Sequence, residues 1–180
     1  MTFTYCGNCG ARTVMRIPEG DHLPRRICDT CGTVHYENPK VVVGCVAEHA
    51  GQILICRRAI EPRRGYWTIP AGFLENGETL EQGAARECQE EALAAVHITS
   101  LLALVSITPA HQVHVFFRAE LPEPKYGVGV ESLETRLVDA ADIPWNEIAF
   151  SSTRYALQRY LDDRAAGVVA HHSTELTQRI

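Results

Sequence analysis

The sequence predicts an α+β protein in which a small metal-stabilised domain precedes a larger one. Three observations favour this fold class. Two Cys-x2-Cys pairs lie within the first 31 residues, short apolar runs bounded by Gly and Pro recur after them, and two segments carry helix start and stop signals. With 180 residues, 46% of them hydrophobic, the chain can bury a substantial core.

Charge and hydropathy exclude several classes of protein. The formal net charge of −5 argues against a protein that coats nucleic acid, which would need a basic face. The N-terminal sequence MTFTYCGNCG has no basic segment followed by an apolar run, and no apolar stretch approaches the roughly 18 residues of a membrane span. We therefore expect a cytoplasmic protein with no membrane partner.

Residues 1–37 are predicted to form a zinc ribbon. The pairs Cys6/Cys9 and Cys28/Cys31 are eighteen residues apart and lie in similar turns, CGNCG and CDTCG. Two such turns direct four thiolates at one tetrahedral Zn²⁺, and four protein ligands leave no open position, so the zinc would be structural. Disulfides are the alternative, which a cytoplasmic location disfavours.

Arginines give this segment a local positive character, and they stand at Arg12, Arg16, Arg25 and Arg26. They serve either ordinary solubility or nucleic-acid binding. The acidic chain has no row of aromatic residues for base stacking beside them, so nucleic acid is not expected as a partner.

The larger domain is predicted to open with a hairpin. VVVGCVAEH and QILICRR read as two strands joined by a tight turn at Ala50-Gly51. Cys45 and Cys56 lie in these apolar runs, where small core residues are expected.

Three side chains after the hairpin are candidates for contact with a substrate. Either Arg57 or Arg58 reaches a phosphate, or both pair with acidic residues of the helix that follows. Trp67, next to Tyr66, lines a pocket or packs in the core.

The central element is a helix predicted from about Leu80 to about Ala95. Thr79 and Gln82 form a capping box at its start. Helical spacing places four charged residues on one side, Arg86, Glu87, Glu90 and Glu91, and small residues on the other, Ala84, Ala85, Cys88 and Ala92.

The acidic side of this helix is either a solvated face or a cation site. Glu87 and Glu91 are like charges four residues apart, and only Arg86 and Glu90 form a favourable pair. Carboxylates about 4 Å apart repel by roughly 4 kcal/mol at a dielectric constant near 20. A partly buried cluster therefore favours a cation, and oxygen ligands without His or Cys suit Mg²⁺ or Mn²⁺.

The remaining elements are two strands, HITSLLALVSIT and HQVHVFFRAEL, then a loop at about 122–129, a strand at TRLV and a second helix. Ser151 or Ser152 is predicted to cap that helix and Gly167 to end it. Residues 166–180 form a weakly patterned tail, in which His171 and His172 indicate surface positions rather than a metal site.

The acidic helix also carries a family resemblance. Seven residues fall in register with the Nudix box G-x5-E-x7-R-E-U-x-E-E-x-G-U, where U is apolar: Gly72, Glu78, Arg86, Glu87, Cys88, Glu90 and Glu91. The chain from Cys6 to about Leu161 thus resembles a Nudix hydrolase with an N-terminal zinc ribbon. The resemblance implies an α/β/α sandwich with a mixed sheet over residues 38–165. One position departs, because Leu93 replaces the late glycine that helps to end the helix in the family.

The resemblance implies a set of site residues. Mg²⁺ or Mn²⁺ would be held by Glu87, Glu90, Glu91 and the backbone carbonyl of Ala71 or Gly72. Arg86 would orient these glutamates, with Glu78 as its ion-pair partner. A loop glutamate, Glu134 first and Glu131 second, would join the metal cluster or act as general base, unless both are solvated loop acids. The catalytic candidates are Glu90, Glu91, Arg86 and Glu134, and the substrate-binding candidates are Arg57, Arg58, Trp67 and Glu131.

The implied reaction is hydrolysis of a nucleoside diphosphate-linked compound. The stretches HYENPKVVVGCV and ESLETRLV resemble the branch of FAD and ADP-ribose pyrophosphatases, and Pro109 lies fifteen residues beyond Ala94 as in ADP-ribose pyrophosphatases. We therefore expect cleavage of FAD or ADP-ribose to AMP plus FMN or ribose 5-phosphate. A homodimer is possible, as in many family members.

Two other functions remain open. NADH pyrophosphatase or NAD-cap hydrolase activity is one, although the SQPWPFP-like motif of NADH pyrophosphatases is absent. A non-catalytic regulator that senses ADP-ribose is the other. Such proteins usually lose carboxylates of the box, whereas Glu87, Glu90 and Glu91 are all present.

Overall fold

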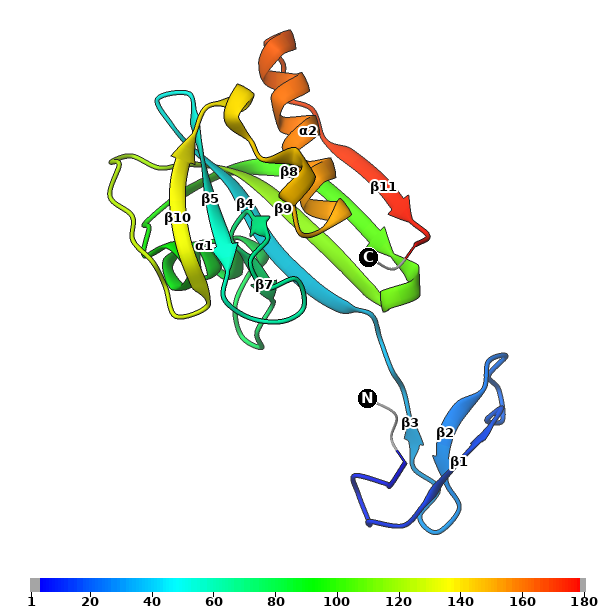
Figure 1. Cartoon of the computed structure of the whole chain (residues 1–180). Coiled ribbons are helices and arrows are strands. Elements are labelled where there is room, and N and C mark those ends of the chain that lie inside the picture. Colours follow the sequence, from blue (N-terminus) through cyan, green and yellow to red (C-terminus); the bar gives the residue numbers. More distant parts are fainter. Residues whose placement is uncertain (1–3, 179–180) are drawn as a thin grey trace. The chain divides into compact units, whose positions relative to one another are not determined.

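The computed structural model describes residues 4–178 and forms two compact units, residues 1–38 and 39–180. Each unit has its own sheet (Figure 1). Neither helix of the described chain is long and apolar enough to cross a membrane.

The first unit is a three-stranded antiparallel sheet of order β1-β2-β3. Its strands are β1 (Thr13–Arg16), β2 (Arg25–Cys28) and β3 (Val34–His35). Among its described residues, the buried apolar side chains are Cys6, Ile27 and Cys28. So small a core cannot hold a sheet by itself, which makes a bound metal the expected source of stability.

The second unit is built on a mixed sheet of order β10-β5-β4-β9-β8-β11, with β6 beside β5 and β7 beside β4. The strands are β4 (Lys40–His49), β5 (Gln52–Arg58), β6 (Trp67–Thr68), β7 (Ala71–Phe73), β8 (His97–Ile107), β9 (Gln112–Glu120), β10 (Ser132–Val138) and β11 (His172–Leu176). β4 pairs with β9 in parallel and β8 with β11 in parallel, while the other pairs are antiparallel.

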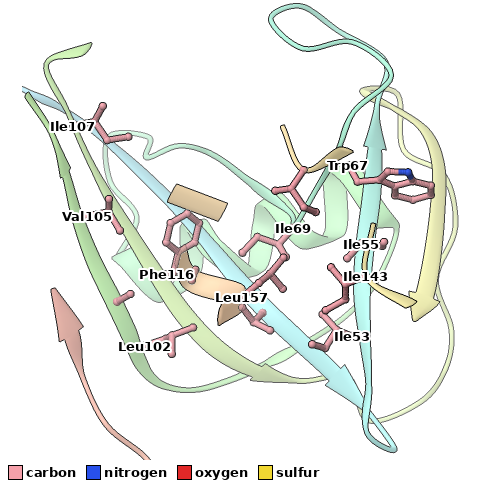
Figure 2. Packing of buried hydrophobic residues seen from close by; sticks show 14 residues of the cluster. Ile53, Ile55, Trp67, Ile69, Leu102, Val105, Ile107, Phe116, Ile143 and Leu157 are labelled. Atoms are coloured by element: carbon pink, nitrogen blue, oxygen red, sulfur yellow. The ribbon is translucent and has the colours of Figure 1, made fainter. Parts of the chain in front are cut away.

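The helices α1 (Leu80–Ala92) and α2 (Ser151–Ala166) cover opposite faces of this sheet. Alternate residues of β5 enter different cores, because successive strand side chains point to opposite faces. Ile53 and Ile55 pack with Leu157 of α2 (Figure 2), whereas Leu54 packs with Ala84 of α1. The predicted α/β/α sandwich is confirmed.

The predicted hairpin between β4 and β5 is also confirmed. Its turn residues Ala50 and Gly51 both have positive φ, 48° and 88°. Two-residue hairpin turns of this kind match the right-handed twist of the strands.

The start of α1 is confirmed and its end is corrected. Thr79 and Gln82 form the predicted capping box. The helix ends at Ala92, before the predicted end near Ala95, because Leu93 takes the left-handed conformation with φ 49°. This is the conformation for which helix ends usually use glycine.

The predicted serine cap of α2 is wrong. Both Ser151 and Ser152 lie inside the first turn, and the N-cap is Phe150, whose ring lies under the Arg58 guanidinium at 5.0 Å. Gly167 ends the helix as predicted, in the left-handed conformation with φ 67°.

The tail contains a strand that the sequence did not indicate. β11 pairs with β8 along its length, and a buried polar cluster fixes its start. Asp163 of α2 contacts Arg118 of β9 and accepts from His172 Nε2 at 3.0 Å, while Arg118 also donates to the Ala170 carbonyl at 2.7 Å. Burial opposes the ionisation of Asp163, but the hydrogen bonds from His172 and the Ala170 amide outweigh it and lower its pKa.

Candidate zinc and catalytic sites

The four predicted zinc ligands come together in the first unit. The Sγ atoms of Cys6, Cys9, Cys28 and Cys31 all lie within 4.8 Å of one another, with Cys6 to Cys31 at 3.6 Å and Cys9 to Cys28 at 3.4 Å. A tetrahedral zinc site with Zn–S bonds of about 2.3 Å separates its sulfurs by about 3.8 Å. The cluster therefore has the chemistry and the dimensions for structural zinc.

The two cysteine pairs lie in turns of the same form. The amide of Gly10 donates to the Cys6 carbonyl at 2.8 Å, and the amide of Gly32 donates to the Cys28 carbonyl at 2.8 Å. Hydrogen bonds from the Thr33 hydroxyl and amide lower the pKa of Cys31 to about 5. Against a lowering hydrogen bond from the Ala11 amide, the neighbouring thiols of Cys28 and Cys31 raise the pKa of Cys9 to about 12, so four thiolates together would need a cation.

The second candidate site lies where α1 meets β7. Cys88 of α1 is buried against Cys45 of β4, while β7 pairs with β4 beside them. A Cβ atom on Gly72 of β7 would lie 2.3 Å from Glu87 Oε1. A side chain at this position would displace the Glu87 carboxylate, which rests directly on the Gly72 backbone.

Arg86 joins the parts of this site through five hydrogen bonds. Its Nε and Nη2 donate to the two oxygens of Glu78 at 2.9 and 2.8 Å, which is the predicted ion pair. Its Nη1 donates to Glu87 at 2.8 Å and Glu90 at 2.9 Å, and Nη2 also donates to the Phe73 carbonyl at 3.1 Å. The Arg86 guanidinium thus orders the loop before α1 and, within α1, the side chains of Glu87 and Glu90.

Glu87 and Glu91 are buried carboxylates with 8% and 6% exposure, whereas Glu90 is exposed. Burial and the negative charge of Glu87 raise the pKa of Glu91 to about 8, although the Ala71 amide donates to Glu91 Oε2 at 3.3 Å. Burial likewise raises the pKa of Glu87. These carboxylates supply the oxygen ligands that hard divalent cations take, and a bound cation would remove the cost of ionising both groups. In the part of the chain that the structure describes, only the four cysteines form a set of three or more such side chains with their ligand atoms gathered within 4.8 Å of one another.

The two loop glutamates, Glu134 and Glu131, lie in different surroundings. Glu134 accepts from Arg136 Nε at 2.6 Å and lies 3.9 Å from Arg57, on the face of β10 turned away from α1. The negative charge of Glu131 instead contributes to the raised pKa values of Glu87 and Glu91. Glu134 lies within β10, whose pairing with β5 shifts register between Ser132 and Glu134, whereas Glu131 lies just before the strand.

The two arginine candidates lie on opposite faces of β5. The positive charge of Arg58 partly offsets the raised pKa of Glu91, although its guanidinium also lies 5.0 Å from the Phe150 ring at the start of α2. Arg57 lies on the other side, where it borders a cavity of about 250 Å³ together with Trp67 and Glu134. Trp67 is only 5% exposed and packs in the core on the α2 side, with the Arg136 guanidinium 5.1 Å from its ring.

Sequence reasoning missed one part of this neighbourhood. Gly127 and Gly129, in the loop between β9 and β10, contact the C-terminal end of α1. The signal was the spaced glycines in YGVGV, which indicate a close backbone approach.

Comparison with known proteins identifies both units. Residues 38–159 match the family described as the NUDIX domain, and residues 4–37 match the Nudix N-terminal zinc ribbon. A crystal structure of a NUDIX hydrolase from Nitrosomonas europaea has a TM-score of 0.91 and 48% identity, covering 98% of this chain and all of that one.

Two curated relatives have named activities. An ADP-ribose pyrophosphatase from Methanocaldococcus jannaschii is 28% identical over 113 residues, which are 61% of this chain and 67% of that protein. An NAD-capped RNA hydrolase, NudC, from Stutzerimonas stutzeri is 28% identical over 170 residues, 89% of this chain and 56% of that protein. The chain thus spans about half the length of the NudC relative. On the family matches and the nearly full-length structural likeness, the chain belongs to the Nudix hydrolase family and carries the Nudix zinc ribbon ahead of its Nudix domain.

Proposed function

We propose that this chain is a divalent-metal-dependent pyrophosphohydrolase that cleaves FAD or ADP-ribose to AMP plus FMN or ribose 5-phosphate. The observation that carries the proposal is the complete carboxylate set on α1, Glu87, Glu90 and Glu91, ordered by Arg86 and set against Gly72. Two of these acids are buried without enough positive charge nearby, an arrangement that favours a bound cation over a solvated helix face.

Each residue has a definite part in the proposed reaction. Divalent ions, when bound, neutralise the charge of the diphosphate and make a water acidic enough to attack at neutral pH. Arg86 holds Glu87 and Glu90 in place. Arg58 supplies positive charge beside Glu91, which would favour the approach of a phosphate. Glu131 is the loop acid that we propose accepts a proton from the attacking water, because its charge acts on Glu87 and Glu91 whereas Glu134 is paired with Arg136.

The choice of substrate class has two sources of support. The archaeal relative is named an ADP-ribose pyrophosphatase. FAD is supported by the sequence resemblance of HYENPKVVVGCV and ESLETRLV to the FAD and ADP-ribose pyrophosphatase branch.

Hydrolysis of NADH or of NAD-capped RNA is the second candidate. A match to NudC over 89% of the chain must include part of the zinc ribbon, so the likeness is not confined to the Nudix domain. The non-catalytic ADP-ribose sensor is the third, and the intact set of glutamates argues against it.

The deciding experiment measures AMP release from FAD, ADP-ribose, NADH and NAD⁺, and cap removal from NAD-capped RNA, with Mg²⁺ or Mn²⁺. The proposal expects FAD or ADP-ribose to have the highest kcat/KM and Glu91→Gln to abolish turnover. Preference for NADH or capped RNA would establish the second candidate. Binding of ADP-ribose without any cleavage would establish the sensor.

A matched pair of variants then identifies the acting loop acid. Glu131→Gln is expected to lower kcat by about 10–100-fold, and Glu134→Gln by less, because Glu134 is paired with Arg136 on the other face. A larger loss of kcat in Glu134→Gln than in Glu131→Gln would show that Glu134 is the acting loop acid. The homodimer and the cytoplasmic location remain predictions, and light scattering tests the first.

A further inference from the structure

The loop between β9 and β10 rests its backbone on the end of the catalytic helix. The amide of Gly127 donates to the Ala92 carbonyl at 2.7 Å, and the amide of Gly129 donates to the Glu91 carbonyl at 3.1 Å. The last carbonyls of an α-helix have no partner within the helix. Two of those of α1 are thus satisfied by a segment that is distant in sequence.

This contact needs a glycine at one of the two positions. A Cβ atom on Gly129 would lie 1.8 Å from the Glu90 carbonyl oxygen and 2.9 Å from the Glu91 carbonyl carbon. Backbone atoms cannot yield as a side chain can, so the loop would have to lift off the helix. A Cβ on Gly127 would approach only the Leu93 side chain, whose Cδ1 atom at 3.0 Å is the one tight contact and can move.

The same loop carries Glu131. The Glu131 carbonyl accepts from the Ala59 amide at 2.8 Å, directly after Arg58, and the Ser132 amide donates to the Gly129 carbonyl at 3.0 Å. Between these anchors Val130 is 97% exposed, so burial of its side chain does not hold the loop. The backbone contacts on α1 and at the end of β5 therefore set the position of Glu131.

We infer that Gly129 is a positioning residue whose missing side chain lets the loop sit on the end of α1 and so fixes where Glu131, two residues further on, stands relative to the glutamates of that helix. The catalytic consequence rests on the proposed function. The Nudix box of this chain has Leu93 in place of its late glycine, and Gly129, from the loop between β9 and β10, contacts the same helix end instead.

The test is a double-mutant cycle between Gly129→Ala and Glu131→Gln. If Gly129 acts through Glu131, each single variant loses about 10–100-fold in kcat with little change in KM, and the double variant is no worse than Glu131→Gln alone. Gly127→Ala is the matched control from the same loop and should keep nearly full activity. Losses that multiply in the double variant, or a Gly129→Ala variant as active as Gly127→Ala, would overturn the inference.

A second readout does not require turnover. Glu131 adds negative charge near Glu87 and Glu91, so Mn²⁺ affinity, measured by electron paramagnetic resonance, should fall in Glu131→Gln and in Gly129→Ala, with no further fall in the double variant. If the wild type cleaves nothing, the proposed function fails while this measurement still decides the inference. Equal Mn²⁺ affinity in Gly129→Ala and the wild type would contradict it.

A milder variant covers the case in which Gly129→Ala does not fold. The Thr135 hydroxyl donates to the Gly127 carbonyl at 2.7 Å and helps to hold the loop. Thr135→Val should lower kcat and Mn²⁺ affinity by about fivefold, the worth of one hydrogen bond, and should have no effect in the Glu131→Gln background. An equal effect in both backgrounds would show that the loop does not act through Glu131.

Discussion

Removal of the Arg86 guanidinium should reduce stability and activity for one shared reason. Arg86→Ala deletes five hydrogen bonds and leaves Glu87 with an unpaired, largely buried carboxylate. Such a group costs about 1–3 kcal/mol. A loss of about 2 kcal/mol corresponds to a fall in Tm of roughly 4–8 °C for a unit of this size. Misplacement of Glu87 and Glu90 should lower kcat by about 10–100-fold, as for other groups that orient metal ligands.

Two comparisons separate orientation from charge. Arg86→Lys keeps the positive charge but cannot hold both Glu78 oxygens and Glu87 at once, so it should recover most of the stability and little of the activity. Added Mg²⁺ should raise the Tm of Arg86→Ala less than that of the wild type, because the misplaced glutamates bind the ion more weakly. Thermal unfolding and AMP release measure these effects. Full activity in either variant would refute the orienting role of Arg86.

Three further predictions concern other parts of the molecule. Leu93→Gly should raise Tm by about 2–4 °C, because left-handed leucine costs about 1 kcal/mol, and a fall would mean that its side-chain packing matters more. In metal-free protein the pKa of Glu91 is raised from an ordinary 4.5 to about 8, so between these pH values the folded state holds a proton on Glu91 that the unfolded state has lost. Tm should therefore fall as the pH rises from about 4.5 to about 8. Glu91→Gln should remove most of that fall, and an unchanged pH profile would contradict the burial argument. Cys28→Ser or zinc chelation should unfold residues 1–38, seen as new protease cleavage there, while a protease-resistant ribbon would argue against structural zinc.

The elements with local signals could be predicted from sequence. The capping box at Thr79, the positive-φ turn at Ala50 and the paired cysteines each depend on neighbours a few residues away. β11 could not be predicted from sequence, because the strand forms only by pairing with β8 and through the contact of His172 with Asp163, which only the folded chain brings together. The prediction of a serine N-cap for α2 was wrong for a related reason. The N-cap residue Phe150 contacts the guanidinium of Arg58, which comes from β5 and is distant in sequence.

The candidate site divides in the same way. The spacing of Glu87, Glu90 and Glu91 is a property of one helix, so the sequence predicts their common side. Glu134 pairs with Arg136 on the face of β10 that is turned away from α1. That placement depends on how β10 pairs with β5, which the residues around Glu134 do not reveal.

The end of α1 shows why the missing glycine of the box need not weaken the site. Leu93 turns the chain in a conformation that costs about 1 kcal/mol, and the helix carbonyls behind it still need donors. Gly127 and Gly129 provide two of these donors, from the loop that also carries Glu131. The helix end and the loop acid are therefore held by the same contacts. A substitution that loosens the end of α1 or the loop should therefore displace Glu131 and lower turnover and metal affinity before it lowers Tm.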